Sequence, residues 1–568
     1  MQNTYVKNLI SKMDIDQKVG ALLTLGFAGT LVRPHIYEDI LKYQCGGLRL
    51  TPQARLFGSY VDPKSGKSIV DVVDSKGYKK GMKAPYANAE EYSKILKELQ
   101  ELAMSRPLGI PLHFSYDQEG GTSADFNFGG VNIFPKPMGI RATGDSKLAY
   151  EVAKAVSRQS RAVGFNWVHS PVLDINTEPM NPEIYTRAYS DRAEDVVEYS
   201  VQSCLGFKEG GLIATAKHFP GRGDSAVDAH FEIPVINVDK ETMLKRELLP
   251  YKVLIEKGLL PSIMIAHSVF PAIDSEDIAT VSKKVLTGLL REELGFEGVI
   301  TTDSMTMGAV AVKYGVANAC ALSLEAGADL VLMKAENKLI EETINMIKKF
   351  VAEGRIPEAE LDKKVYRVLS LKYEYGLFTN GSQWNEKPED VIKDEKVINL
   401  SKLVAKKSVL IAKDKNNLLP LKKDEKVLVI EQINKQPNDM TWYPGILYKN
   451  CLKYNQKATY LETSYRYDDE DKASILNAIK DYDTIVITNF YIRGSISNNE
   501  FIAEILKDKT KKVVVVTNTP YPLSIPKGSD TLIITFATSP HNIEATAGVI
   551  FGEISPEGEW PIEYKLQD

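Results

Sequence analysis

Short apolar runs alternate with helix-length segments through the first 334 residues of this 568-residue sequence. Each run is apolar almost throughout, which is typical of strands that are covered on both faces. The runs are GALLTLGF (20–27), CGGLRL (45–50), LHFSYD (112–117), FNWVHSPVLD (165–174), LIATAKHF (212–219), SIMIAHS (262–268), GVITTDSM (298–305) and DLVLMK (329–334). Several gaps between them carry apolar residues at the three- and four-residue spacing of a helix, namely 89–106, 147–164 and 316–327. This alternation predicts a parallel sheet built from βα units.

Polar side chains stand at the carboxyl ends of several of these runs. They are Asp117, Asp174, Lys217, His218, His267 and Asp303. An open doubly wound sheet would also fit the alternation, but only a closed barrel gathers so many strand ends around one point. We therefore predict an α/β fold whose main part is a (β/α)8 barrel of the TIM type, with these residues at its mouth.

A second series of apolar, β-branched runs follows between residues 408 and 536, with charged helical segments such as 468–481 between them. A chain of this length exceeds one ordinary hydrophobic core, so a second domain is expected. The polar stretch TNGSQWNEKPED (379–390) has the composition of a connection. We predict a catalytic barrel over 1–380, a linker over 381–400 and an α/β sandwich domain over 401–568.

The segment KHFPGRGDSAVDAH (217–230) concentrates charged residues, histidines and glycines directly after a strand. Core packing does not explain that composition. Gly221 and Gly223 permit backbone geometry that other residues resist, so we expect a shaped loop. Asp228 and His230 are two residues apart, and in an extended loop both project to the same side. The carboxylate can then hold one imidazole nitrogen while the other faces a substrate, which is the arrangement of a proton shuttle.

This segment resembles the signature K-H-F-P-G-H-G-D-T-x-x-D-S-H of the β-N-acetylhexosaminidase branch of glycoside hydrolase family 3. Further matching segments follow the family's order along most of the chain. They are DQKVGALLTLGF (16–27), DQEGG (117–121), PVLDINTEP (171–179), IYTRAYSD (184–191), GVITTDSMTMGA (298–309) and GVIFGEISPEGEWP (548–561). The resemblance implies a (β/α)8 barrel followed, as in many members, by an α/β sandwich.

The resemblance also implies an activity and a set of site residues. The family's nucleophile falls on Asp303, and its acid/base dyad falls on Asp228 and His230. The implied reaction is the hydrolysis of terminal β-linked N-acetylglucosamine with retention, through a covalent glycosyl-Asp intermediate. The resemblance places sugar-binding positions at Asp117, Arg187, Lys217 and His218, and an orienting carboxylate at Asp174.

The chain departs from the family pattern at three places. DQEGG is followed by TSADFNFGG instead of the usual Arg-containing stretch that contacts the sugar. The missing arginine could be supplied by the insertion 51–88, for example by Arg55, and this insertion could shape the pocket. Arg222 stands where the family has His, and Ala229 where it has Ser. An added cation at position 222 should lower the pKa of His230.

The sequence contains no pattern for a cofactor or a metal. G-x-G-x-x-G does not follow the first run, and Walker-type, H-E-x-x-H and clustered Cys/His patterns do not occur, so we expect no cofactor. The net charge of −5 gives no reason to expect nucleic acid, and no apolar run is long enough for a membrane span. The N-terminal residues lack a signal-peptide pattern, so we expect a cytoplasmic protein. The histidines His35, His113, His169 and His541 are interpreted as structural.

Three other functions remain compatible with the sequence. A β-glucosidase of the same family would use a Glu from the second domain as its acid, which the dyad argues against. A phosphorylase is possible because a histidine acid/base tolerates an anionic acceptor. A glycan-binding sensor without turnover would have little reason to keep both Asp303 and the dyad. The source of the glycan, such as peptidoglycan or chitin, and the oligomeric state stay open.

Overall fold

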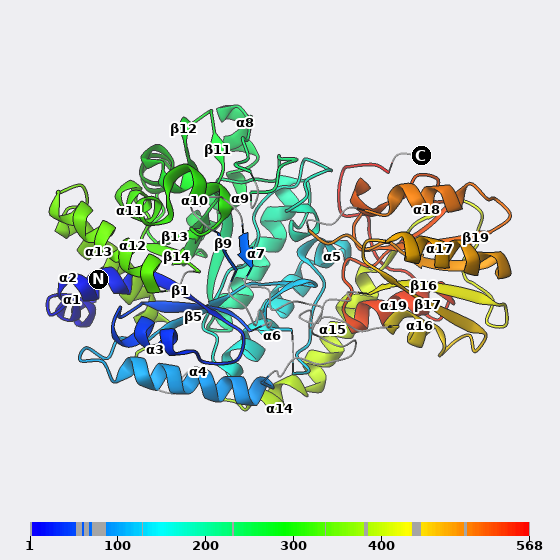
Figure 1. Ribbon diagram of the computed structural model, residues 1–568, viewed down its shortest axis with the longest axis horizontal. Helices are drawn as coiled ribbons and strands as arrows, with labels where there is room; N and C mark the ends of the chain where they lie inside the picture. Colours follow the sequence, from blue (N-terminus) through cyan, green and yellow to red (C-terminus); the bar gives the residue numbers. More distant parts are fainter. Residues whose placement is uncertain are drawn as a thin grey trace.

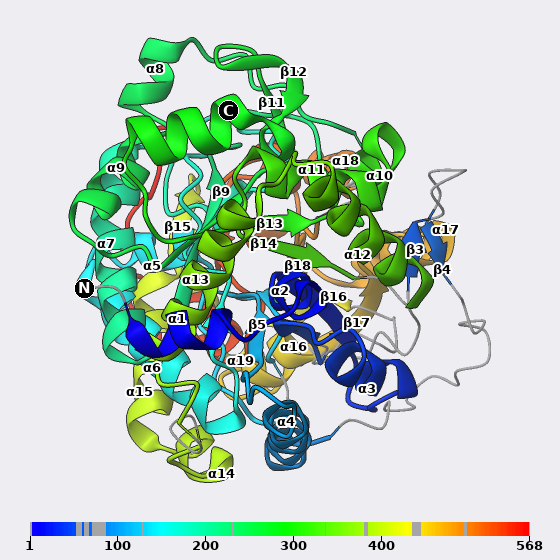
Figure 2. The same cartoon turned by 90° about the vertical axis from the view of Figure 1, so that its left-hand side faces the viewer.

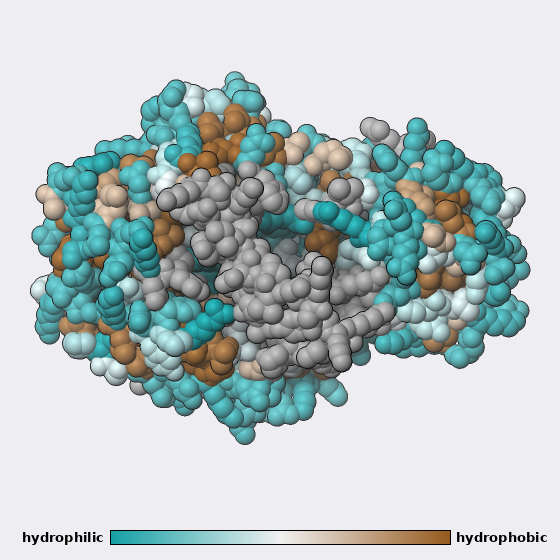
Figure 3. Space-filling model, in the orientation of Figure 1, coloured by the Kyte–Doolittle hydropathy of each residue, from teal (hydrophilic) through white to brown (hydrophobic). Residues whose placement is uncertain are grey.

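The structure is a computed structural model that describes residues 3–52, 59–61, 68–70, 87–127, 129–229, 232–334, 337–379, 384–433, 445–493 and 497–566. Two parts lie side by side along the long axis in Figure 1, with the N-terminal part in blue to green and the C-terminal part in yellow to red. Among the residues coloured by hydropathy on this face, most are hydrophilic, and hydrophobic ones show as scattered patches (Figure 3).

The N-terminal part is a closed barrel of parallel strands in the order β1-β14-β13-β10-β9-β8-β5-β2. Its strands are β1 (Leu23–Ala28), β2 (Gly47–Thr51), β5 (His113–Tyr116), β8 (Trp167–Val168), β9 (Ile213–Phe219), β10 (Ser262–Ile265), β13 (Val299–Ser304) and β14 (Leu330–Met333). Each strand coincides with one of the eight apolar runs, with β1 and β2 extending one residue beyond theirs, so the prediction of a TIM-type barrel is confirmed. The short antiparallel pairs are β3 (Ser59–Val61) with β4 (Ser68–Val70), β6 (Gln118–Gly120) with β7 (Ser123–Ala124), and β11 (Val269–Phe270) with β12 (Asp274–Ile278).

Helices surround the barrel strands, as the view from the N-terminal side shows (Figure 2). They are α1 (Thr4–Ile10), α2 (Ile15–Ala21), α3 (Pro34–Leu41), α4 (Ala89–Met104), α5 (Pro137–Ala142), α6 (Lys147–Val163), α7 (Ala193–Glu209), α8 (Lys240–Lys245), α9 (Leu249–Glu256), η4 (Lys284–Glu293), α10 (Gly308–Tyr314), α11 (Val316–Ala326), α12 (Asn337–Ala352) and α13 (Glu358–Glu374). The helix α4 illustrates why these segments form: Asn88 and Glu91 make a reciprocal capping box at its start. Its buried residues Tyr92, Leu96, Leu99 and Ala103 recur at helical spacing, so one face packs on the barrel.

The C-terminal part is a six-stranded sheet in the order β15-β20-β19-β18-β16-β17, parallel except for β15. Its strands are β15 (Leu410–Asp414), β16 (Val427–Ile433), β17 (Ala458–Ser464), β18 (Thr484–Thr488), β19 (Lys512–Thr517) and β20 (Thr531–Ile534). Val427 and Val429 pack with α16 (Ile446–Cys451) and α19 (Pro540–Ile550), whereas Leu428 and Ile430 pack with α17 (Asp469–Ala478) and α18 (Asn499–Leu506). Alternate residues of one strand thus serve two cores, which confirms the predicted α/β sandwich.

Two helices, α14 (Pro388–Ile392) and α15 (Glu395–Ser408), connect the two parts along the lower edge of Figure 1. They lie in and just beyond the stretch 381–400 that we expected to be a linker, and α15 packs against α5, α6 and α19. The exact division into domains stays a prediction. Among the described residues, no helix combines the length and the apolar character needed to cross a bilayer.

The carboxyl edge of the second sheet faces the barrel. Tyr491, after β18, donates a hydrogen bond from its hydroxyl to the Pro182 carbonyl (2.8 Å). Tyr521, after β19, donates in the same way to the Asn176 carbonyl (3.2 Å). Loops at the ends of two sheets therefore meet, and such loops are the usual place for binding and catalysis.

Lys372 on α13 is buried at the opposite, amino-terminal end of the barrel, where its ammonium donates to the carbonyls of Gly46 (2.6 Å) and Pro111 (2.9 Å). Burial, with nearby Arg106, lowers its pKa to about 7. The unfolded chain keeps this proton up to a pH of about 10, so it binds more protons than the native state between pH 7 and 10. The free energy of unfolding should therefore rise with pH across this window.

We expect Lys372→Met to flatten that rise by a few kcal/mol, because the variant removes the group whose pKa differs between the two states. Urea unfolding of both proteins at pH 7, 8 and 9 measures the difference. Parallel pH dependences for the two proteins would contradict the assignment.

Candidate active site

A polar pocket opens at the carboxyl ends of the barrel strands. Five of the predicted site residues line it, namely Asp117, Arg187, Lys217, His218 and Asp303. Of the other predicted residues, Asp174 lies beneath His218 and Asp228 lies at the side facing the second domain. The remaining one, His230, lies outside the described residues.

Asp117 follows β5 and is held by two cations. Its Oδ1 accepts a hydrogen bond from Lys217 Nζ (2.7 Å), and its Oδ2 accepts one from Arg49. Burial opposes the charge on Asp117, but Arg49 and Lys217 outweigh burial and hold the pKa of the carboxyl well below its usual range. Asp117 is therefore an ionised acceptor at the floor of the pocket.

Glu119 is a second, buried carboxylate next to this floor. Arg187 donates to both of its oxygens, from Nε (2.7 Å) and from Nη2 (2.9 Å), and Lys217 Nζ lies 2.6 Å from Oε1. Burial again opposes the charge, but Arg187 and Lys217 lower the pKa of Glu119 to about 2. The bidentate pair fixes the plane of the Arg187 guanidinium.

Asp174 orients His218. His218 Nδ1 lies 2.6 Å from Asp174 Oδ2, and both side chains are buried. Burial raises the pKa of Asp174 to about 6 and lowers that of His218 well below its usual value. At neutral pH we therefore infer an ionised Asp174 that accepts from Nδ1–H of a neutral imidazole, which leaves Nε2 as an acceptor toward Arg187 Nη2 (3.5 Å). This geometry fits the predicted orienting role of Asp174, which stays a prediction.

Asp303 lies at the end of β13 and lines the pocket. Its Oδ1 accepts a hydrogen bond from Ser304 N (2.7 Å). Its Oδ2 lies 3.7 Å from Nη2 of Arg222, a buried residue of the 217–230 loop. One oxygen is thus fixed by the backbone while the other faces a cation.

The 217–230 loop has the shaped backbone that its glycines predict. Gly221 has a φ of +126°. A Cβ on Gly223 would lie 1.7 Å from the Ile175 carbonyl oxygen, so only glycine fits there. The loop then brings Asp228 to the second domain, where Oδ2 lies 3.3 Å from Arg493 Nε. Arg222, Arg493 and the backbone N–H of Ala229 all contact Glu183, so the dyad loop and Asp303 belong to one network.

Sequence reasoning missed several residues of this site. Arg49 lies within the second apolar run and pairs with Asp117 and with Asp125 Oδ2 (2.6 Å). It supplies a cation beside the segment that lacks the family's arginine, whereas the candidate Arg55 lies outside the described residues. A basic residue inside an otherwise apolar run was the available signal. His169, interpreted as structural, also lines the pocket, 3.6 Å from Asp117 Oδ1. Glu183 and Arg493 carried no recognisable signal.

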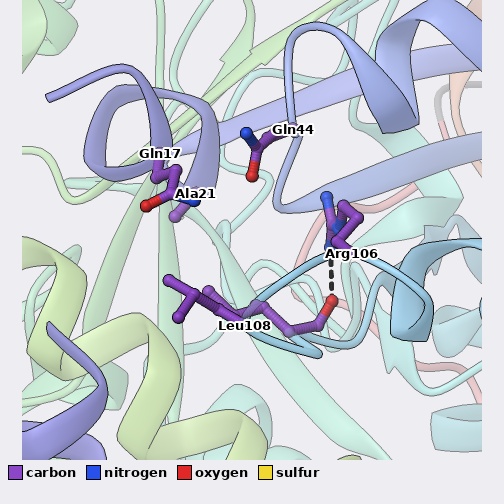
Figure 4. Close-up of a pocket in the computed structure, with 6 residues that line it drawn as sticks. Gln17, Ala21, Gln44, Arg106 and Leu108 are labelled. Atoms are coloured by element: carbon purple, nitrogen blue, oxygen red, sulfur yellow. Dashed lines mark hydrogen bonds between the residues drawn. The ribbon is translucent and has the colours of Figure 1, made fainter. Parts of the chain in front are cut away.

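A second, much smaller cavity lies at the amino-terminal end of the barrel, between Gln17, Ala21, Gln44, Arg106 and Leu108 (Figure 4). Arg106 donates from Nη2 to the carbonyl of Ile110 and from Nη1 to that of Cys45 (3.1 Å). Its guanidinium thus caps the backbone, which is the structural role expected at this end of a barrel. Among the described residues, no group of three His, Cys, Asp or Glu side chains is arranged to hold a metal.

Comparison with known proteins gives the family. Residues 15–371 match the Glycosyl hydrolase family 3 N terminal domain. The match covers more than half of the chain, so the chain belongs to glycoside hydrolase family 3, as its motifs predict.

Several relatives are named as β-hexosaminidases or β-N-acetylglucosaminidases. The chain is 29% identical to Beta-hexosaminidase A of Pseudoalteromonas piscicida over an alignment of 306 residues. This alignment covers 50% of this chain and 51% of that protein. It is 28% identical to the Beta-N-acetylglucosaminidase/beta-glucosidase of Cellulomonas fimi over an alignment of 337 residues. This alignment covers 57% of this chain and 59% of that protein. The chain thus spans 51% to 59% of these curated relatives. A solved family 3 beta-N-acetylglucosaminidase from Paenibacillus sp. str. FPU-7 superposes with a TM-score of 0.85 at 27% identity, covering 97% of this chain and 99% of that one.

Proposed function

We propose that the protein is a retaining, exo-acting β-N-acetylhexosaminidase that removes terminal β-linked N-acetylglucosamine. The observation that carries this proposal is the meeting of Asp303 and the Asp228 loop in one network around a pocket at the barrel mouth. The names of the relatives from Pseudoalteromonas, Cellulomonas and Paenibacillus support the sugar.

Asp303 is the nucleophile in this proposal. Its carboxylate attacks the anomeric carbon and forms a glycosyl ester while His230 donates a proton to the leaving oxygen. Water then attacks the same carbon, His230 takes its proton, and the ester bond breaks to release the sugar with its configuration retained. Arg222 Nη2, 3.7 Å from Asp303 Oδ2, places a positive charge beside the attacking carboxylate.

Asp228 holds His230 in this scheme. Its negative charge stabilises the imidazolium that forms when His230 acts as a base. Because His230 is neutral after it has given up its proton, it places no second negative charge against Asp303. A histidine acid/base therefore suits a site whose nucleophile is a carboxylate.

The floor of the pocket suits a neutral sugar. Six Lys and Arg residues line the pocket, and five of them each contact a carboxylate, so most of its positive charge is balanced; the five are Arg49, Lys217, Arg187, Arg222 and Arg493. Charged donors and acceptors that are fixed in this way can form hydrogen bonds with sugar hydroxyls. Ligands without such hydroxyls would leave these groups unpaired and are rejected.

Apolar side chains complete the pocket. Met264, Met307 and Leu332 line it beside the charged groups. These side chains offer an apolar surface for the methyl of an acetamido group. Glucose and xylose have no acetamido group.

A panel of 4-nitrophenyl β-glycosides of N-acetylglucosamine, N-acetylgalactosamine, glucose and xylose tests the sugar. We expect kcat/KM for the N-acetylglucosaminide to exceed that for the glucoside by about 100-fold, a difference of about 3 kcal/mol in transition-state binding. Release of 4-nitrophenol at fixed pH gives each value. Equal or greater activity on the glucoside would overturn the proposed sugar and favour the β-glucosidase activity in the name of the Cellulomonas relative.

A further inference from the structure

The second domain contributes a guanidinium to the barrel pocket. Arg493 follows β18 and lines the pocket together with Lys217, His218 and Asp303. Its Nε lies 3.3 Å from Asp228 Oδ2, and its Nη1 lies 3.5 Å from Glu183 Oε1. The side chain is 33% exposed, so it forms part of the rim between the pocket and the solvent.

The loop that carries Arg493 is fixed against the barrel. Two residues earlier, the Tyr491 hydroxyl donates to the Pro182 carbonyl (2.8 Å), and the Tyr491 ring packs edge-on against Tyr185 with 5.0 Å between centroids. The Tyr491 backbone is also held from within its own domain, because Tyr491 N donates to Asn518 Oδ1 (2.8 Å) and Asn518 Nδ2 donates to the Tyr491 carbonyl (2.9 Å). The backbone that precedes Arg493 is therefore held in place, and this fixes where its side chain enters the mouth of the barrel.

Glu183 joins Arg493 to the dyad loop. It is buried, and its Oε1 forms an ion pair with Arg222 Nη2 (2.9 Å) while its Oε2 accepts a hydrogen bond from the backbone N–H of Ala229 (3.3 Å). Ala229 lies between the two dyad residues in the chain. Glu183 thus fixes the backbone of the dyad loop, and Arg493 fixes the side chain of Asp228.

Charge explains why the second contact matters. Asp228 is 8% exposed, and a buried carboxylate stays ionised only where a cation or hydrogen-bond donors offset the loss of water. Only the ionised form of Asp228 carries the negative charge that stabilises an imidazolium. The cation comes from the second domain, from a segment far from Asp228 in the sequence.

We propose that Arg493 is a positioning residue through which the second domain keeps Asp228 ionised and oriented toward His230. This inference rests on the proposed function, because it requires the dyad to be the acid/base. It assigns the second domain a part in proton transfer that none of the family motifs carries.

The dependence of the rate on the leaving group tests this role. A poor leaving group needs its oxygen protonated as the bond breaks, whereas 2,4-dinitrophenolate leaves without that help. We expect Arg493→Met to lower kcat/KM about 10- to 100-fold on aryl N-acetylglucosaminides with weakly acidic phenols, but less than about threefold on the 2,4-dinitrophenyl substrate. Arg493→Lys keeps the charge and should recover part of the loss.

The matched control is Glu559→Gln, which removes a different ion pair across the same interface, that of Glu559 Oε2 with Arg141 Nη1 (3.5 Å). This variant should keep the wild-type dependence on the leaving group. An equal loss by Arg493→Met on all leaving groups would overturn the positioning role and leave only a structural one.

Asp228→Asn, measured with the same substrates, separates the two proposals. If Asp228→Asn steepens the dependence of the rate on the leaving group and Arg493→Met does not, the proposed role of Arg493 is wrong, while the proposed Asp228–His230 acid/base is retained. If Asp228→Asn does not steepen it either, the proposed acid/base is wrong, and the role of Arg493 falls with it.

Discussion

The Asp303→Asn variant is expected to lose at least about 1000-fold in kcat, because an amide cannot form the glycosyl ester that the two-step reaction requires. Asparagine has nearly the same shape, and its carbonyl can still accept the hydrogen bond from Ser304 N, which is 2.7 Å long in the wild type. The pocket should therefore stay intact. Initial rates on the 4-nitrophenyl N-acetylglucosaminide and calorimetric binding of N-acetylglucosamine measure the two effects.

The control for this variant is Asp277→Asn, which makes the same chemical change on β12, away from the residues that line the pocket. We expect it to retain wild-type turnover. Hydrolysis by Asp303→Asn at a rate close to that of the wild type would show that another group is the nucleophile.

The second large effect is expected for His230→Ala. General acid/base catalysis contributes about 10²- to 10⁴-fold, so kcat should fall by a factor in this range on 4-nitrophenyl substrates. Hydrolysis of the glycosyl-enzyme would then be slow, because no general base activates the attacking water molecule. Azide needs no base, so it should restore turnover and yield the β-glycosyl azide, which chromatography and mass spectrometry detect.

A matched variant for this experiment is His541→Ala, because His541 Nδ1 lies in the second domain, 2.9 Å from Ser401 Oγ. It should respond to azide as the wild type does. If His230→Ala retains full activity without azide, or is not accelerated by azide, the histidine is not the acid/base.

The barrel was predictable because its strands carry a local signal. A strand covered on both faces is apolar along its length, so each apolar run marked one strand, and the residue at the end of the run marked the mouth. Asp117, Lys217, His218 and Asp303 were found in this way, and the structure brings them into one pocket.

The rest of the site depends on contacts between distant segments. Arg49 reaches Asp117 and Asp125 because β2 lies beside β5 in the barrel, and the sequence around residue 49 does not indicate these partners. Glu183 precedes a matching motif but is distinguished only by its contacts with Arg222 and Ala229. The insertion 51–88 lies largely outside the described residues, so its part in the pocket stays a prediction.

Arg493 shows the same limit across two domains. The runs after residue 400 predicted a separate sheet, but not that the carboxyl ends of its strands would face the barrel mouth. The orientation of two packed domains depends on side-chain contacts such as that of Tyr491 with Pro182, which leave no periodic pattern in either segment.

The covalent bond to Asp303 is the claim on which the account stands, and trapping that bond tests it most directly. A fluorinated N-acetylglucosaminyl fluoride slows the second step more than the first, so the glycosyl-enzyme accumulates and can be digested and mapped by mass spectrometry. We predict one sugar per chain, attached to Asp303 within the peptide that contains TTDSM. A sugar attached to any other residue, such as Asp228 or Glu183, would contradict the account.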